Sequence, residues 1–91
     1  MHLMHLSNMT AEDKRTYQLY FEEVESFTSS GYEKIDKSSF GFFEIMGYST
    51  ILRHPGNGNH VEVVCHLLAR KVEVWKNGKI VKSIDTCRTV A

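Results

Sequence analysis

Residues 71–84 read KVEVWKNGKIVKSI, and this stretch decides the fold. Two runs that mix β-branched and charged side chains flank the dipeptide Asn77-Gly78. Asn-Gly supplies the two positive-φ residues of a type I′ turn, whose twist matches that of a two-stranded hairpin. The sequence therefore predicts an antiparallel hairpin with Asn77 and Gly78 at its tip.

The two-residue turn also predicts the register of this hairpin. Counting outward from the turn places Lys76 opposite Lys79, Trp75 opposite Ile80, Val74 opposite Val81, Glu73 opposite Lys82 and Arg70 opposite Asp85. Two of these pairs join opposite charges, which favours the register. One face is then expected to carry Val72, Val74 and Val81, and the other face Trp75, Ile80 and Ile84 beside the Glu73–Lys82 pair.

An amphipathic helix is predicted over residues 10–30. Thr10 followed by Asp13 resembles a capping box, in which each side chain bonds a free amide of the first turn. Apolar side chains recur at spacings of three and four and form one stripe, which consists of Tyr17, Tyr20, Phe21, Val24 and Phe27. Gly31 suits the left-handed residue that ends a helix.

Two further apolar stretches lie between the helix and the hairpin, after a polar connector at residues 33–39. Residues 40–54 are rich in aromatic and β-branched side chains, which favour strand, and Gly47 is expected to form a bend or bulge within them. Residues 55–59 contain Pro, Gly and Asn and predict a turn. Residues 61–68 fit either a strand or a short helix, and their β-branched content favours a strand.

These elements predict an α+β fold, in which one N-terminal amphipathic helix packs on an antiparallel β-meander of about four strands. A chain of 91 residues suits a single domain over 1–91, with a flexible N-terminal segment at 1–9, the helix at 10–30 and the sheet at 40–86. The predicted core joins the helix stripe to one face of the sheet, and consists of Tyr17, Tyr20, Phe21, Val24, Phe27, Phe42, Ile51, Val61, Val63, Val72, Val74 and Val81.

Charge is distributed unevenly along the chain, although the formal net charge is +0. Residues 1–45 carry four basic and eight acidic side chains, and residues 46–91 carry seven basic and three acidic ones. We expect the acidic helix and the basic part of the sheet to attract each other. A net charge of zero gives no overall field that would favour a nucleic acid or an acidic membrane.

The ends of the chain and its cysteines predict a cytoplasmic protein without a membrane partner. No stretch approaches the roughly 20 apolar residues of a membrane span. Residues 1–9 lack the basic start and cleavage site of a secretory signal. Cys65 and Cys87 lack metal-ligand spacing and are too few for a disulfide scaffold. Cys65 lies in an apolar run and is expected to be a small buried side chain.

No catalytic constellation is visible, so we expect a non-enzymatic protein without a cofactor. Cys65 and His66 are adjacent, and adjacent strand residues point to opposite faces, so they cannot act together as nucleophile and base. If residues 55–59 close a hairpin, His54 and His60 would face each other with Glu62 on the same side, a ligand set that suits a divalent cation. No short-range ligand motif supports this, and we assign no metal site.

Apolar side chains on both faces of the predicted hairpin favour a protein-binding module. One helix covers only one face, so Trp75, Ile80 and Ile84 are expected to contact another protein or a second copy of this chain. By analogy of size alone, such a module compares with the stoichiometric inhibitors that phages use against larger protein machines.

The alternative is a nucleic-acid-binding regulator. It would use Lys76, Lys79 and Lys82 of the hairpin for phosphate contacts, and Trp75 for stacking on a base.

Overall fold

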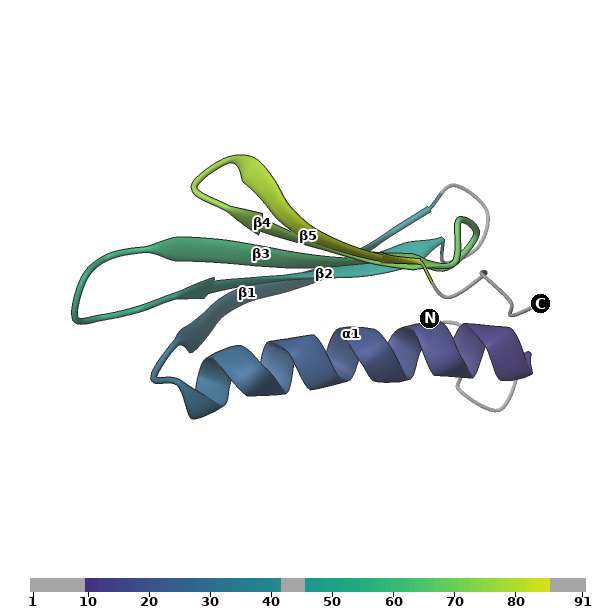
Figure 1. Cartoon of the computed structure of the whole chain (residues 1–91), viewed down its shortest axis with the longest axis horizontal. Coiled ribbons are helices and arrows are strands. Elements are labelled where there is room, and N and C mark those ends of the chain that lie inside the picture. The colour runs from purple at the N-terminus through teal and green to yellow at the C-terminus, as the bar shows by residue number, and fades with distance from the viewer. Residues whose placement is uncertain (1–9, 42–45, 86–91) are drawn as a thin grey trace.

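A computed structural model of the chain describes residues 10–41 and 46–85. The elements follow one another as helix α1 (Ala11–Ser29) and strands β1 (Glu33–Phe40), β2 (Gly47–Arg53), β3 (His60–His66), β4 (Lys71–Lys76) and β5 (Lys79–Asp85). The strands are antiparallel and lie side by side in sequence order. Helix α1 packs beneath one face of the sheet, and no described element covers the other face (Figure 1). The predicted α+β architecture is confirmed.

Helix α1 begins and ends where the sequence predicts. The Thr10 hydroxyl accepts a hydrogen bond from the Asp13 N–H at 3.1 Å, and the Asp13 carboxylate accepts one from the Thr10 N–H at 3.2 Å. This capping box satisfies two amides of the first turn. At the other end Gly31 adopts a φ of 98°, and the Tyr32 N–H donates to the Phe27 carbonyl at 3.1 Å.

The sheet has five strands, whereas the sequence predicts about four. The additional strand is β1, which contains the whole predicted polar connector at 33–39 together with Phe40, so the sheet begins at Glu33 and not at residue 40. Every residue of β1 is exposed, and its sequence EKIDKSSF has no alternation of apolar and polar side chains that would indicate a half-buried strand. Gly47, predicted as a bend, is instead the first residue of β2. Strand β3 (His60–His66) includes residues 61–66, so the favoured strand is confirmed for most of the range 61–68.

The core lies between α1 and the three central strands. Its buried apolar side chains are Tyr20, Val24, Leu52, Val61, Val63, Cys65, Leu67, Val72 and Val74. Three predicted core residues lie elsewhere. Phe21 is 45% exposed because the buried stripe of α1 runs through Thr16, Tyr20 and Val24. Val81, in the edge strand β5, is 58% exposed. Ile51 alternates with the inward Thr50 and Leu52, so it points to the uncovered face. Phe42 lies outside the described residues.

The hairpin of β4 and β5 has the predicted turn but not the predicted register. Trp75 pairs with Ile80 and Lys76 with Lys79, as expected. A bulge at Val81 then shifts every later pair, so Val74 lies opposite Lys82, Glu73 opposite Ser83, Val72 opposite Ile84 and Lys71 opposite Asp85. The predicted pairs Val74–Val81, Glu73–Lys82 and Arg70–Asp85 are therefore wrong. Because of the extra residue, Lys82 and Ile84 face α1.

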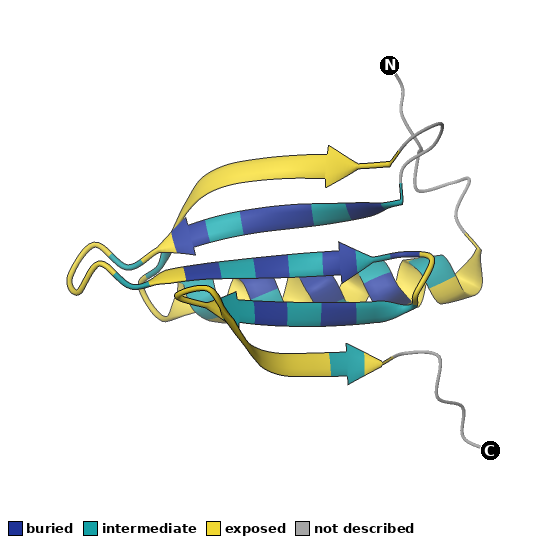
Figure 2. Cartoon of the chain, turned by 90° about the horizontal axis from the view of Figure 1, so that it is seen from above, coloured by how far each residue is buried: buried dark blue, intermediate teal, exposed yellow. Residues whose placement is uncertain are grey.

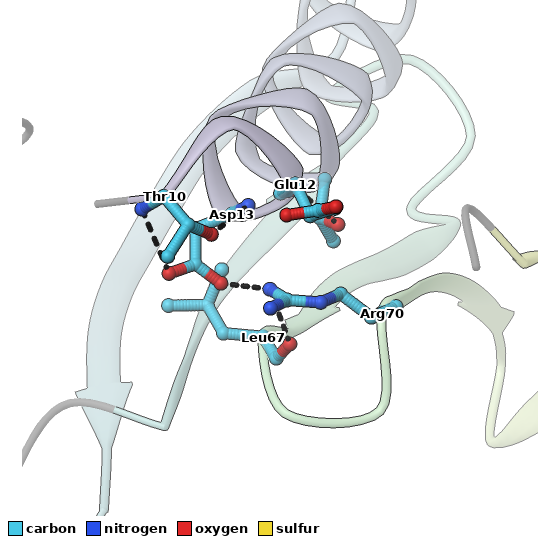
Figure 3. A network of polar contacts seen from close by, with 6 residues as sticks. Thr10, Glu12, Asp13, Leu67 and Arg70 are labelled. Carbon is cyan, nitrogen blue, oxygen red and sulfur yellow. Dashed lines mark hydrogen bonds and ion pairs between the residues drawn. The ribbon is translucent and has the colours of Figure 1, made fainter.

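Among residues 10–41 and 46–85, two ion pairs join the helix to the sheet layer. Arg70 binds the Asp13 carboxylate and also donates to the Leu67 carbonyl at 3.2 Å, so the turn between β3 and β4 is held against the first turn of α1 (Figure 3). Lys82 pairs with Glu23 farther along the helix. Both pairs connect an acidic residue of the first half to a basic residue of the second, which agrees with the predicted attraction between layers.

Candidate functional site

The candidate site is the face of the sheet that points away from α1, which we call the open face. Side chains alternate along a strand, so the residues between the core positions of β2, β3 and β4 point to this side. The open face includes Phe40, Ser49, Ile51, Glu62, Val64, His66, Lys71, Glu73, Trp75 and Ile80, with the polar Asp36, Ser38, Arg53 and His60 toward its margins. Figure 2 views the molecule from this side, with α1 behind the sheet, and shows that the central strands carry half-buried positions between the buried ones.

One row of side chains crosses four strands of the open face. Ile51 lies opposite Glu62, Glu62 opposite Trp75, and Trp75 opposite Ile80. Neighbours in such a row have Cβ atoms about 4.5–5.5 Å apart, so they form one continuous patch. We call these four residues the Trp75 row. It is apolar except for the Glu62 carboxylate near its middle.

A shallow cavity of about 160 Å³ opens beside the Trp75 row, toward the tip of the β4–β5 hairpin. Ile51, Glu62 and Trp75 line it, together with His60, Val61, Asn77 and Gly78. The Glu62 carboxylate accepts a hydrogen bond from the Ser49 hydroxyl at 2.7 Å, and within the described residues it has no ion pair. The cavity therefore combines apolar walls with an unneutralised negative charge.

Glu73 fixes the orientation of Trp75. Its carboxylate accepts a hydrogen bond from the indole N–H at 3.2 Å, and it lies 3.0 Å from His66 Nε2 and 3.2 Å from the Lys71 ammonium. Burial raises the pKa of Glu73, but the hydrogen bonds from His66, Trp75 and Lys71 outweigh it, so the pKa lies below the ordinary value. The ionised carboxylate thus holds the indole in place.

The structure brings together two of the three predicted partner-binding residues. Trp75 and Ile80 are cross-strand neighbours on the open face, and Ile80 is 47% exposed. Ile84 is half-buried and packs against the core on the α1 side, so the predicted face is wrong for this residue. Its displacement follows from the bulge at Val81.

The three lysines predicted for nucleic-acid contacts are divided. Lys76 and Lys79 lie opposite each other at the exposed hairpin tip. Lys82 lies on the α1 side, where its ammonium is 2.8 Å from Glu23. Trp75 points to the opposite face from Lys82, so the indole and this lysine do not share a surface.

Ile51 and Glu62 belong to the site, but we did not predict them as partner-binding residues. Glu62 stands between Val61 and Val63, so its outward position is visible in the sequence. Ile51 is followed directly by the apolar Leu52, so the sequence alone does not show which of the two points outward. Their position beside Trp75 depends on the pairing of β2, β3 and β4, which the hairpin turn alone does not determine.

The predicted histidine pair is not formed. His60 lies opposite Arg53, and His54 lies opposite Asn59, to whose carbonyl its N–H donates a hydrogen bond. The two histidines are therefore not cross-strand partners. The His54 ring accepts a hydrogen bond from the Gly56 N–H at 3.0 Å and packs edge-on against Tyr32. Within residues 10–41 and 46–85, no three His, Cys, Asp or Glu residues form a group that could hold a metal ion.

Comparisons with protein-family models, curated proteins and solved structures found no match to this chain. In the part of the chain that the structure describes, no helix has the length and apolar character needed to cross a membrane.

Proposed function

We propose that this protein is a non-enzymatic binding module whose open face docks another protein. The observation that carries the proposal is the Trp75 row, in which Ile51 and Trp75 flank one carboxylate and Ile80 extends the apolar surface beyond Trp75. Tryptophan held rigidly beside a cavity is typical of the residues that dominate binding energy at protein interfaces. Such a module acts by occupying a surface of its partner, as a stoichiometric inhibitor does.

The partner that fits the open face presents a lysine or arginine flanked by apolar side chains. Apolar side chains and the Glu62 carboxylate line the cavity beside Trp75, and within the described residues the carboxylate has a hydrogen bond from the Ser49 hydroxyl but no ion pair. A cation there would lie against the indole face and pair with the carboxylate. Ile51 and Ile80 would pack against the apolar neighbours of that cation.

The sheet edges support docking on the face rather than addition of a strand. The outer strands β1 and β5 each contain a bulge, at Ile35 and at Val81. Both strands also carry lysines, and bulges and lysines are the features by which natural sheets prevent edge-to-edge pairing. The open face carries the continuous Trp75 row, whereas both edges carry these protective features, so the open face is the surface we assign to the partner.

Site-specific photocrosslinking tests this proposal. An Ile80→p-benzoylphenylalanine variant, activated in extract from the native host, is expected to link to a partner segment that contains a basic residue beside apolar ones. The same label introduced as Glu25→p-benzoylphenylalanine, on the exposed side of α1, is the matched control and should not give that product.

The photocrosslink formed from position 80 should be lost when the labelled protein also carries the substitution Trp75→Ala or Glu62→Gln. Amide NMR spectra of both variants should remain those of the folded protein. A product that persists in both variants, or one that forms equally from position 25, would contradict docking at the Trp75 row.

The alternative proposal, a nucleic-acid-binding regulator, has one favourable observation. Lys76 and Lys79 face each other at the hairpin tip, and within the described residues neither forms an ion pair. A salt titration with short single-stranded and duplex oligonucleotides tests it, because phosphate contacts weaken steeply as salt increases. Absence of binding at low salt would exclude this function.

A further inference from the structure

A groove of about 350 Å³ lies between α1 and strands β1 and β2, on the side of the sheet opposite the open face. It exists because one helix is too narrow to cover five strands. Helix α1 packs mainly on β3 and β4, and in Figure 2 it runs behind these strands and leaves β1 uncovered. The volume lies at the small end of the range for ligand sites, roughly 300–1,000 Å³.

Lys34 and Lys37 of β1 both line this groove. Residues three apart in a regular strand point to opposite faces. Here the bulge at Ile35 adds a residue, so Lys34 lies opposite Leu52 and Lys37 opposite Thr50, both of which face α1. The bulge therefore places two lysines along the same groove, and neither has an ion pair in the described part of the chain.

Aromatic side chains form the opposite wall. The rings of Tyr17 and Tyr48 meet edge-on with centroids 5.2 Å apart, and Tyr20 lies 5.6 Å from Tyr17. Phe21 adds an exposed ring at the rim. Burial raises the pKa of the phenols of Tyr20 and Tyr48, so they stay protonated and uncharged at neutral pH. The groove thus has an uncharged aromatic side, with rings inclined to one another, and a cationic side.

We infer that this groove binds a small ligand that combines a planar aromatic ring with an anionic group. The ring lies against Tyr17, Phe21 and Tyr48, where aromatic rings stack or meet edge-on. The anion lies between Lys34 and Lys37, which supply two charge-assisted contacts. This site is independent of the open face, because the two lie on opposite sides of the sheet.

Titration of the ¹⁵N-labelled protein with four probes tests the inference. Adenosine monophosphate and indole-3-carboxylate both join a ring to an anion, and they distinguish a phosphate from a carboxylate ligand. Adenosine supplies a ring alone, and inorganic phosphate supplies an anion alone. At least one of the two combined probes is expected to shift the amide signals of groove residues at concentrations where neither half-probe does.

Two variants locate the site. Lys34→Gln/Lys37→Gln should weaken binding by about tenfold or more, since two charge-assisted contacts are lost. Arg15→Gln/Arg53→Gln makes the same change of charge at two exposed positions that do not line the groove, and it should leave binding unchanged. Phe21→Ala, at an exposed position, should weaken binding by several-fold without unfolding the protein.

The inference is wrong if neither combined probe shifts the groove signals at millimolar concentration. It is also wrong if adenosine or phosphate binds as well as the combined probes, or if the Lys34→Gln/Lys37→Gln variant binds like the unmodified protein.

Discussion

The Lys82 ammonium lies 2.8 Å from the Glu23 carboxylate of helix α1, although counting from the hairpin turn assigns Lys82 to Glu73. The single extra residue Val81 causes the difference. It turns Lys82 toward the helix and leaves Glu73 to hold Trp75 on the open face. One bulge therefore determines both an interlayer ion pair and the composition of the candidate site.

Deletion of Val81 should leave the fold intact. Without this residue Ile80 and Lys82 still lie opposite Trp75 and Val74, so every other pair is retained. We expect the free energy of unfolding, measured in urea, to change by less than about 1 kcal/mol, because Val81 is mostly exposed. Deletion of Glu73 is the control. It would shift the register of a central strand, and it should unfold the protein.

Deletion of Val81 should also make the β5 edge of the sheet more prone to pair with a second molecule. A bulge discourages pairing between edge strands, so its removal is expected to promote self-association at high concentration. Sedimentation velocity measures this. A fully folded, monomeric variant at all concentrations would show that the bulge has no protective role.

Cys65 should remain unreactive in the folded protein. It is fully buried, and desolvation raises the pKa of its thiol to about 12. In a Cys87→Ser background, labelling by a thiol reagent near pH 8 is expected only as fast as the protein unfolds. Fast labelling without denaturant would contradict the burial of Cys65.

The raised pKa of Cys65 also predicts a loss of stability at high pH. The folded state favours the protonated thiol, so its contribution is complete below the ordinary value of 9.0 and is lost as the pH rises toward about 12. Tyr20 and Tyr48, whose pKa values are raised by burial, act in the same direction above their ordinary value of 10.0. Urea unfolding between pH 8 and 11 should show a continuous decrease.

Protonation of Glu73 at acid pH should change the fluorescence of the single tryptophan, Trp75. Its pKa lies below the ordinary value of 4.5, so its hydrogen bond to Trp75 is retained above that value and lost as the pH falls through the lowered pKa. A fluorescence transition below pH 4.5 is expected in the native protein and should be absent in Glu73→Gln. A transition that Glu73→Gln leaves unchanged would assign it to another group.

Asp13 should contribute more to stability than other acidic residues of α1. It caps the helix and binds Arg70, with only 18% of its side chain exposed. Asp13→Ala is expected to lower the free energy of unfolding by about 1–2 kcal/mol. Glu25→Ala, at an exposed position of the same helix, should change it by less than about 0.5 kcal/mol.

The elements of the fold with a local signal were predictable from the sequence. The capping box at Thr10, the stripe of α1 and the Asn77-Gly78 turn each occupy a few neighbouring residues. Strand β1 was missed because both of its faces are exposed, so it has no apolar alternation. The bulge at Val81 was missed because a register can shift without any change in the turn.

Part of the candidate site was predictable as well. Trp75 and Ile80 flank the turn closely enough for the turn to place them. The exclusion of Ile84 depends on the bulge, and the inclusion of Glu62 depends on pairing between strands that are distant from the turn. The groove beside Lys34 and Lys37 depends on a second bulge, at Ile35, and on the width of one helix relative to five strands.

The packing of α1 mainly on β3 and β4 also governs the order in which the molecule is completed on the ribosome. The helix is synthesised before the sheet, but its apolar stripe cannot be fully buried until β3 and β4, which end near residue 76, have left the exit tunnel. Synthesis proceeds at about 5–20 residues per second, so Tyr20 and Val24 remain solvated for several seconds. The meander itself needs only contacts between neighbouring strands. Docking of α1 onto β3 and β4 therefore waits for the synthesis of most of the sheet.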